Sequence, residues 1–148
     1  MKQAVEIITR GVCCVDGRVL LCLTRGDSNS FLPGGHVDFG ESARVALERE
    51  VREELGMDSR AGRFLGAVEH AFTQRGEPHC EVNLVFEVSI PTLTPDSAPV
   101  SAEPHLEFRW VAVDELAAAA VEPRPLSELV PAWLRTVNGV ERFGSTLA

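Results

Sequence analysis

The sequence contains no tyrosine and few basic residues. Only 14 of its 148 residues are Lys or Arg, against 22 that are Asp or Glu, and the formal net charge is −8. Because binding to a nucleic-acid backbone relies on a surplus of Lys and Arg, this balance argues against nucleic acid as a partner. If the ligand is itself an anion, cations must mediate its binding.

Long apolar runs and paired cysteines are also missing. No stretch of about 18 apolar residues occurs, so neither a transmembrane helix nor a membrane partner is expected. Residues 1–6 lack the apolar stretch of a secretory signal, and we expect a cytoplasmic protein. None of the cysteines, Cys13, Cys14, Cys22 and Cys80, lies in a C-x-x-C pair. We expect them to be small buried hydrophobic residues in a reducing compartment.

The chain has the size of one domain, residues 1–148, and no repeat or linker divides it. Two β-rich runs, 10–15 and 18–24, are separated by Asp16-Gly17 and predict a hairpin. Further strand candidates are residues 64–73, 81–90 and 108–113. The polar segment 74–78 is expected to be the loop that joins the second pair.

Three segments have helical patterns. The first, residues 42–55, has Ser42 as a cap and Gly56 as a stop. Two shorter helices are expected at 114–121 and 126–137, the second broken or bent near Pro131 and packed onto the sheet by Trp133. The proline-rich segment 91–104 is expected to be a surface loop. Strands that alternate with helices predict an α/β or α+β sandwich.

The first helix carries an acidic face. Glu50, Glu53 and Glu54 are spaced i, i+3 and i+4, which places them on one side of a helix, whereas Arg49 and Arg52 are expected to project to other sides. Like charges at this spacing repel one another. Converging carboxylates suit a hard divalent cation such as Mg²⁺, which also accepts phosphate oxygens. From composition alone, a capped, charged surface helix is an equally good interpretation.

The spacing around this helix resembles a known pattern. Gly35 is followed by five residues, Glu41, seven residues, and then R-E-V-R-E-E-L-G-M at 49–57. This resembles the Nudix box, G-x5-E-x7-R-E-U-x-E-E-x-G-U, in which U is an apolar residue, and every defined position is met. Residues 32–35 and 107–116 also resemble segments of that family. The resemblance implies a Nudix-type α/β/α sandwich with a mixed β-sheet and the Nudix loop-helix-loop.

The resemblance also implies a reaction. Nudix hydrolases cleave a diphosphate bond in a nucleoside diphosphate linked to another moiety, by attack of water at phosphorus, with Mg²⁺ as cofactor and Mn²⁺ as a substitute. By the matching positions, Glu50, Glu53 and Glu54 are expected to bind the metal, together with a Gly34 or Gly35 carbonyl. Arg49 is expected to orient the glutamates through charge-assisted hydrogen bonds.

The general base and the substrate contacts stay open at this point. The base is expected either in the helix, as Glu53 or Glu54, or at the end of the proline-rich loop, as Glu103 or Glu107. The candidates for substrate binding are Arg25, Phe31, Gly34 and Gly35. Phe31 and Phe72 suit stacking on a base, although core packing is the ordinary role of a single aromatic residue.

The resemblance implies a small-molecule nucleotide as substrate, and we expect either a nucleoside triphosphate or a nucleotide sugar-like diphosphate. The absence of tyrosine argues against the family's dinucleoside polyphosphate branch, and the markers of the ADP-ribose and coenzyme A branches are also missing. The alternative is a Nudix-like regulatory module that binds a nucleotide without turnover. The intact box glutamates argue against it. A homodimer is compatible with the resemblance, but no apolar stripe indicates an interface.

Overall fold

The computed structural model describes residues 3–135 and 142–147. Its helices are α1 (Ala43–Leu55) and α2 (Leu126–Arg135), with two short 3-10 helices, η1 (Val113–Glu115) and η2 (Ala117–Ala119). Its strands are β1 (Glu6–Val12), β2 (Cys14–Val15), β3 (Arg18–Thr24), β4 (Ser30–Phe31), β5 (Gly34–His36), β6 (Arg60–Gln74), β7 (Glu77–Ser89), β8 (Leu106–Ala112), β9 (Val121–Glu122) and β10 (Phe143–Ser145).

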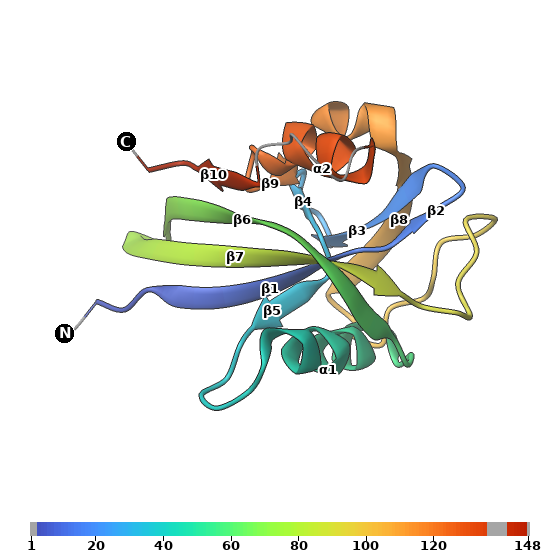
Figure 1. Cartoon of the computed structure of the whole chain (residues 1–148), viewed down its shortest axis with the longest axis horizontal. Helices are drawn as coiled ribbons and strands as arrows, with labels where there is room; N and C mark the ends of the chain where they lie inside the picture. The colour runs from blue at the N-terminus through green and yellow to red at the C-terminus, as the bar shows by residue number, and fades with distance from the viewer. Residues whose placement is uncertain (1–2, 136–141, 148) are drawn as a thin grey trace.

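The strands form two sheets. The first has the order β10-β6-β7-β1-β5, in which β1 is parallel to β7 and antiparallel to β5. The second has the order β2-β3-β4-β9, with β8 paired to β3. Helix α1 lies on one side of the strands, and α2 lies with the 3-10 helices on the other (Figure 1). This arrangement confirms the predicted α/β/α sandwich with mixed pairing, although the strands divide into two sheets.

Each helix covers its own hydrophobic core. On the α2 side, Trp133 is fully buried in a cluster with Leu65 and Val68 of β6. On the α1 side, Leu47 and Val51 pack in a second cluster with residues of β3, β7 and β8. Strand β3 alternates between the two clusters, which explains why its sequence is continuously apolar. Trp133 therefore packs α2 onto the sheet as predicted.

Helix α1 begins and ends where the sequence indicates. The Ser42 hydroxyl accepts a hydrogen bond from the Val45 amide at 3.2 Å, and Gly56 ends the helix in the left-handed conformation with φ of 67°. The apolar residues Leu47, Val51 and Leu55, which recur at helical spacing, are buried. The helix is thereby fixed to the core along one side while its acidic residues stand at the other.

The first predicted hairpin is shorter than expected. Residues Asp16 and Gly17, with φ of 50° and 73°, form the turn between β2 and β3. Residues 10–12, however, belong to β1 in the first sheet, so the run 10–15 is split between two sheets. The chain passes from the first sheet to the second at Cys13, which lies between β1 and β2. The Cys13 carbonyl accepts a hydrogen bond from the Leu20 amide at 3.1 Å.

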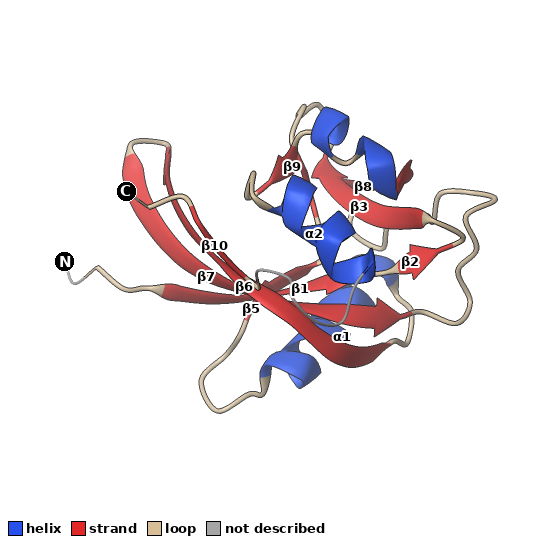
Figure 2. Ribbon diagram, turned by 45° about the horizontal axis from the view of Figure 1, so that its top comes forward, coloured by secondary structure: helices blue, strands red, loops and turns tan. Residues whose placement is uncertain are grey.

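The second hairpin is longer than expected. Strands β6 and β7 pair up to Gln74 and Glu77, so the turn is only Arg75-Gly76, with φ of 52° and 82°. The segment 74–78 is therefore not a five-residue loop. An αL residue followed by glycine suits a tight two-residue turn, which extends the pairing on both sides. The hairpin reaches well past the helices (Figure 2).

The C-terminal part differs most from the sequence prediction. The prediction of a helix at 114–121 is wrong, because η1, η2 and the short strand β9 occupy this segment. Helix α2 runs through Pro131 without a break and is described to Arg135, and the predicted residues 136 and 137 lie outside the described part of the chain. Pro131 is buried against the core, and this packing favours the helix despite the missing amide donor.

Two expectations from composition can be compared with the structure. No helix in the part of the chain that the structure describes is long and apolar enough to cross a membrane. All four cysteines are free thiols; Cys13 and Cys22 are buried as expected, Cys80 is half-buried, and Cys14 is exposed at the β2 hairpin. The expectation of a buried thiol is thus wrong for Cys14.

Candidate active site

The two glycines before α1, Gly34 and Gly35, lie in strand β5. Gly34 has φ of 147°, and a Cβ atom there would overlap the Thr9 carbonyl of β1. A Cβ atom at Gly35 would lie 2.5 Å from the Glu50 carboxyl carbon. Both positions therefore need glycine, the first for pairing with β1 and the second for the close approach of Glu50.

Glu54 is a buried carboxyl group with one unused oxygen. Glu54 is only 8% exposed, and its Oε1 atom accepts a long hydrogen bond of 3.4 Å from the Gly34 amide. Its Oε2 atom is buried and accepts no hydrogen bond from any described residue. Burial raises the pKa of Glu54 to about 8, although the nearby charge of Arg10 acts in the opposite direction. This oxygen is available to a cation.

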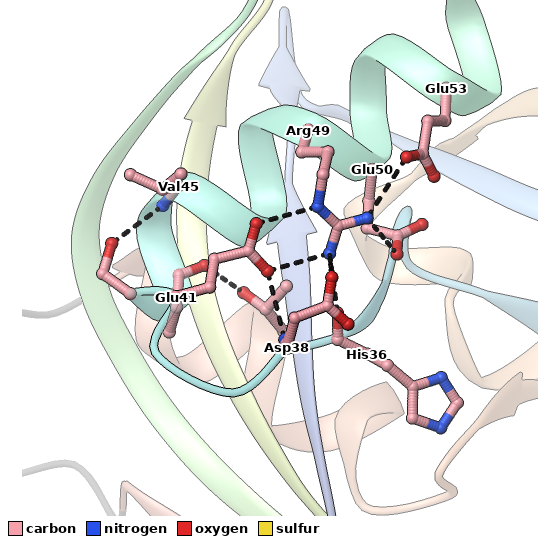
Figure 3. A network of polar contacts seen from close by, with 10 residues as sticks. His36, Asp38, Glu41, Val45, Arg49, Glu50 and Glu53 are labelled. Carbon is pink, nitrogen blue, oxygen red and sulfur yellow. Dashed lines mark hydrogen bonds and ion pairs between the residues drawn. The ribbon is translucent and has the colours of Figure 1, made fainter.

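The Arg49 guanidinium group donates hydrogen bonds to three other carboxylates. Its Nε and Nη2 atoms donate to the two oxygens of Glu41 at 2.8 and 2.9 Å, and its Nη1 atom donates to Glu50 at 3.1 Å and to Glu53 at 3.2 Å (Figure 3). The hydrogen bonds from Arg49 lower the pKa of Glu41 to about 2. The long side chain of Arg49 folds back over the acidic face, so the prediction that it projects elsewhere is wrong.

The acidic side chains are consequently divided into two groups. Glu50 and Glu53 bond to Arg49, whereas Glu54 faces Gly34. Within residues 3–135 and 142–147, no three Asp, Glu, His or Cys side chains stand close enough together to hold a metal ion as placed. The three carboxylates of the helix therefore share one face as predicted but do not converge on one point.

A cavity of about 310 Å³ opens beside Glu50 and Glu54. It is lined by Arg10, Cys22, Leu23, Thr24, Phe31, Gly34, Glu50, Glu54, Glu103, His105 and Leu106. Five of these residues (Phe31, Gly34, Glu50, Glu54 and Glu103) are site candidates from the sequence. Glu53 is exposed and does not line this cavity.

Glu103 is brought to this cavity by the loop between β7 and β8. The Ala102 amide and the Ser101 hydroxyl both donate to the Glu54 carbonyl, at 2.8 and 3.2 Å. Ser101 also accepts a hydrogen bond from the Glu103 amide at 3.0 Å. These contacts attach the loop to the end of α1, so the proline-rich segment is anchored at the site rather than only covering the surface.

A larger cavity of about 690 Å³ lies beside the first. Phe72 lines it and stacks between His70 and His79, with ring centroids 5.0 and 4.9 Å apart. Core packing, the ordinary expectation for Phe72, is therefore wrong. Phe31 and Arg10 line both cavities, so the larger cavity, which we call the aromatic chamber, adjoins the smaller, acidic cavity. Arg10 was not among the candidates predicted from the sequence, although a charged residue within an apolar strand is a signal that could have indicated it.

Arg25 and Glu107 occupy a different place. The Arg25 Nη1 atom pairs with Glu107 at 2.8 Å, and its Nε atom donates to the Pro104 carbonyl at 2.9 Å. Both residues line a neighbouring cavity of about 380 Å³, which shares Leu23 and Leu106 with the cavity of Glu50 and Glu54. Neither residue lines the cavity of Glu50 and Glu54, and their predicted roles in substrate binding and catalysis stay predictions.

The polar residues Asn83 and His36 make contacts outside these cavities. Asn83 is fully buried, and its amide donates to the Val68 carbonyl at 3.4 Å and to Glu81 at 3.3 Å. The His36 ring points away from Arg49 (Figure 3) and lies 2.7 Å from a carboxylate oxygen of Glu6. Neither side chain lines the two joined cavities.

The donors at the smaller cavity fit a hard divalent cation. Glu50 and Glu54 present carboxylate oxygens, and the buried Oε2 atom of Glu54 has unused acceptor capacity. Glu53 lies one turn from Glu50 and shares its Arg49 contact. Gly34 contacts Glu54 through its backbone amide, whereas the expected contact with the metal would use its carbonyl. That role of Gly34 stays a prediction.

Comparison with known proteins identifies the family. A family model described as NUDIX domain matches residues 7–132 of the chain. The chain therefore belongs to the Nudix family, and it is a Nudix pyrophosphohydrolase, an enzyme of the class that acts on nucleoside diphosphate derivatives. Members of this family act on small-molecule nucleotides and generally require a divalent metal ion.

Solved structures share the fold. The solution structure of the E. coli ORF135 protein matches with a TM-score of 0.68 at 24% identity, over 92% of this chain and 96% of that chain. A MutT protein from Methanosarcina mazei Go1 matches with a TM-score of 0.72 at 21% identity, over 91% and 96%. An ADP-ribose pyrophosphatase from Streptococcus suis 89-1591 matches with a TM-score of 0.61 at 18% identity, over 96% and 99%.

Proposed function

We propose that this enzyme is a Mg²⁺-dependent pyrophosphohydrolase whose substrate is a nucleoside triphosphate or a nucleotide sugar-like diphosphate. The observation that carries the proposal is the pair of joined cavities. One is lined by Glu50 and Glu54 on α1, and the other is an aromatic chamber of about 690 Å³. A chamber of this size and character suits a nucleoside, with its diphosphate directed toward the acidic helix.

Glu50 and Glu54 would hold the metal, with Glu53 as a further ligand that must turn from Arg49. When bound, Mg²⁺ (or Mn²⁺ in its place) neutralises charge on the diphosphate and on its leaving group. Arg49 is a positioning residue in this proposal. Its hydrogen bond to Glu50 fixes the rotamer of that carboxylate, and its two hydrogen bonds to Glu41 hold Glu41 beside the helix.

Glu103 is the general base in this proposal. It lines the same cavity as Glu50 and Glu54, and the Ser101 contacts hold its loop against the end of α1. Its carboxylate would take the proton of the attacking water. Glu107 is less suited, because it is paired with Arg25 outside this cavity. Glu54 is also less suited, because its carboxylate is proposed as a metal ligand.

The experiment is a turnover assay on a panel of nucleoside triphosphates and nucleotide sugars, with Mg²⁺ and with chelator. We expect release of pyrophosphate or of a nucleoside monophosphate from at least one substrate, only with metal. Glu103→Gln should lower kcat by at least about 100-fold because general-base catalysis contributes this much. Glu107→Gln is the matched control and should change kcat little.

The alternative is a regulatory module that binds nucleotide without turnover. Saturable binding of a nucleotide, with no product from any substrate in the presence of Mg²⁺ or Mn²⁺, would favour that module. If turnover occurs and Glu107→Gln rather than Glu103→Gln abolishes it, the assignment of the base is wrong while the enzyme class stands.

A further inference from the structure

Arg10 stands at the junction of the two cavities. It lies on β1, between Gly34 of β5 and Val85 of β7, in the middle of the first sheet. Its side chain lines both the acidic and the aromatic cavity. Phe31 lies against it, with 5.7 Å between the Arg10 Cζ atom and the ring centroid. A ligand that occupies both cavities must therefore pass Arg10.

The guanidinium group of Arg10 has donors to spare. Its Nη1 atom donates to the Leu32 carbonyl at 3.0 Å, which fixes the orientation of the group. Its Nε atom is buried and has no hydrogen-bond partner. The charges of Glu54 and Glu81 act on it, yet Arg10 forms no ion pair with any residue in the described part of the chain. An oriented arginine with a free buried donor is ready to bind an anion.

The surroundings of Arg10 are otherwise acidic. Carboxylates line the larger cavity at Asp27, Glu81 and Glu122, and they line the smaller one at Glu50, Glu54 and Glu103. Among the described residues, Arg10 is the one Lys or Arg that lines either cavity. A phosphate group in this cleft is repelled by the carboxylates, so its binding depends on Arg10 wherever no metal ion neutralises it.

From these contacts we infer that Arg10 binds the phosphate next to the nucleoside and thereby aligns the substrate across the two cavities. The nucleoside lies in the larger cavity against Phe31 and Phe72, and the remaining diphosphate extends toward Glu50 and Glu54. This inference rests on the proposed function, because it assumes a nucleotide substrate. It assigns to Arg10 a role that metal ions do not fill, namely recognition of the first phosphate.

The test measures binding in chelator, so that it does not depend on turnover. Calorimetry compares AMP, GMP, CMP and UMP with their nucleosides, on wild type and on Arg10→Gln. We expect wild type to bind the best monophosphate at least about tenfold more tightly than its nucleoside, as a charge-assisted hydrogen bond provides. In Arg10→Gln this ratio should fall to about one, with the affinity for the nucleoside retained.

Two further variants make the test decisive. Arg10→Lys keeps the charge but not the planar fork, so the ratio should fall only in part. Arg18→Gln removes an exposed arginine of β3 and should leave the ratio unchanged. If Arg10→Gln does not fold, as judged by thermal melting, Arg10→Lys carries the comparison, and an unchanged ratio there contradicts the inference.

The outcomes separate this inference from the proposed function. A wild type that binds monophosphate no better than nucleoside, or an Arg10→Gln variant with the wild-type ratio, overturns the role of Arg10 even if the enzyme turns over. A wild type without turnover on any nucleotide overturns the proposed function, whereas loss of the ratio in Arg10→Gln would still support the phosphate contact.

Discussion

Individual side chains at this site differ in how their charge is balanced. Arg49 bonds to Glu41, Glu50 and Glu53, so one guanidinium group neutralises much of the acidic cluster. Glu54 has no such partner and is buried beside Gly34. The two kinds of carboxylate therefore respond differently to pH and to substitution. Glu41 is held ionised, whereas burial favours the protonated form of Glu54.

Glu54 makes the stability of the metal-free protein depend on pH. Its pKa rises from 4.5 to about 8 on folding. The stabilisation that this provides is complete below the unfolded-state pKa and is lost as the pH rises toward the folded-state pKa. One unit corresponds to about 1.4 kcal/mol, so the loss should amount to a few kcal/mol.

Chemical denaturation in chelator, at several pH values between 4.5 and 8, measures this effect. The free energy of unfolding of wild type should fall across this window more steeply than that of Glu54→Gln, and the variant should be the more stable protein at the upper end. Equal slopes for the two proteins would mean that Glu54 is not held in a site that favours its protonated form.

Substitution of Arg49 tests its role as a positioning residue. Arg49→Lys keeps the charge but lacks the planar fork that bonds to both oxygens of Glu41 while it reaches Glu50, so Glu50 should lose its fixed rotamer. We expect kcat with Mg²⁺ to fall by about 10- to 100-fold. Arg52→Lys on the same helix is the control, because Arg52 is exposed and pairs with Asp58 outside the site. An unchanged kcat in Arg49→Lys would contradict this role.

At the residue scale, the sequence identified the acidic cluster but not its contacts. The spacing of Glu50, Glu53 and Glu54 predicted a shared helix face, which depends only on helix geometry. The predicted direction of the Arg49 side chain was wrong because a helical wheel gives only the directions of the Cβ atoms. A long side chain can fold back across a turn of the helix. Arg10 was missed because its neighbours along the chain are not its neighbours at the site.

At the scale of elements, close contacts of glycine fix how strands meet helices. Gly35 lies against Glu50, and Gly66 of β6 lies against Trp133 of α2. The hairpin turns at Asp16-Gly17 and Arg75-Gly76 follow from left-handed backbone conformations at both residues of each turn. Such local features make α1 and the first hairpin predictable. The split of residues 10–15 between two sheets depends on long-range pairing and could not be predicted in this way.

Gly66 offers a test of the contact between α2 and the sheet. A Cβ atom at this position would overlap the Trp133 ring and lie 2.5 Å from the Arg142 carbonyl. Gly66→Ala should lower the free energy of unfolding by about 1–3 kcal/mol, as overpacking does. Gly62→Ala on the same strand is the matched control, since the nearest atom to its Cβ would be 3.6 Å away. Equal melting temperatures for the two variants would contradict the tight packing of Trp133.

At the scale of the whole molecule, the two cavities are assembled from segments that lie far apart in the sequence. Helices α1 and α2 cover opposite sides of the strands (Figure 1), and Arg10 and Phe31 stand where the acidic and aromatic cavities meet. The sandwich and the acidic helix were predictable, because the box spacing resembles that of a family. The aromatic chamber was not, because its walls come from the distant segments 27–31, 70–74 and 122–123.

The most direct measurement is the turnover of wild type and Glu54→Gln on the best substrate of the panel, with Mg²⁺ and with chelator. Asp58→Asn is the control, because it removes an exposed carboxylate just beyond α1. We expect wild type and Asp58→Asn to turn over only with Mg²⁺, and Glu54→Gln to lose at least about 100-fold in kcat while remaining folded. Turnover of Glu54→Gln at the wild-type rate would contradict the central claim that the acidic helix is the catalytic centre.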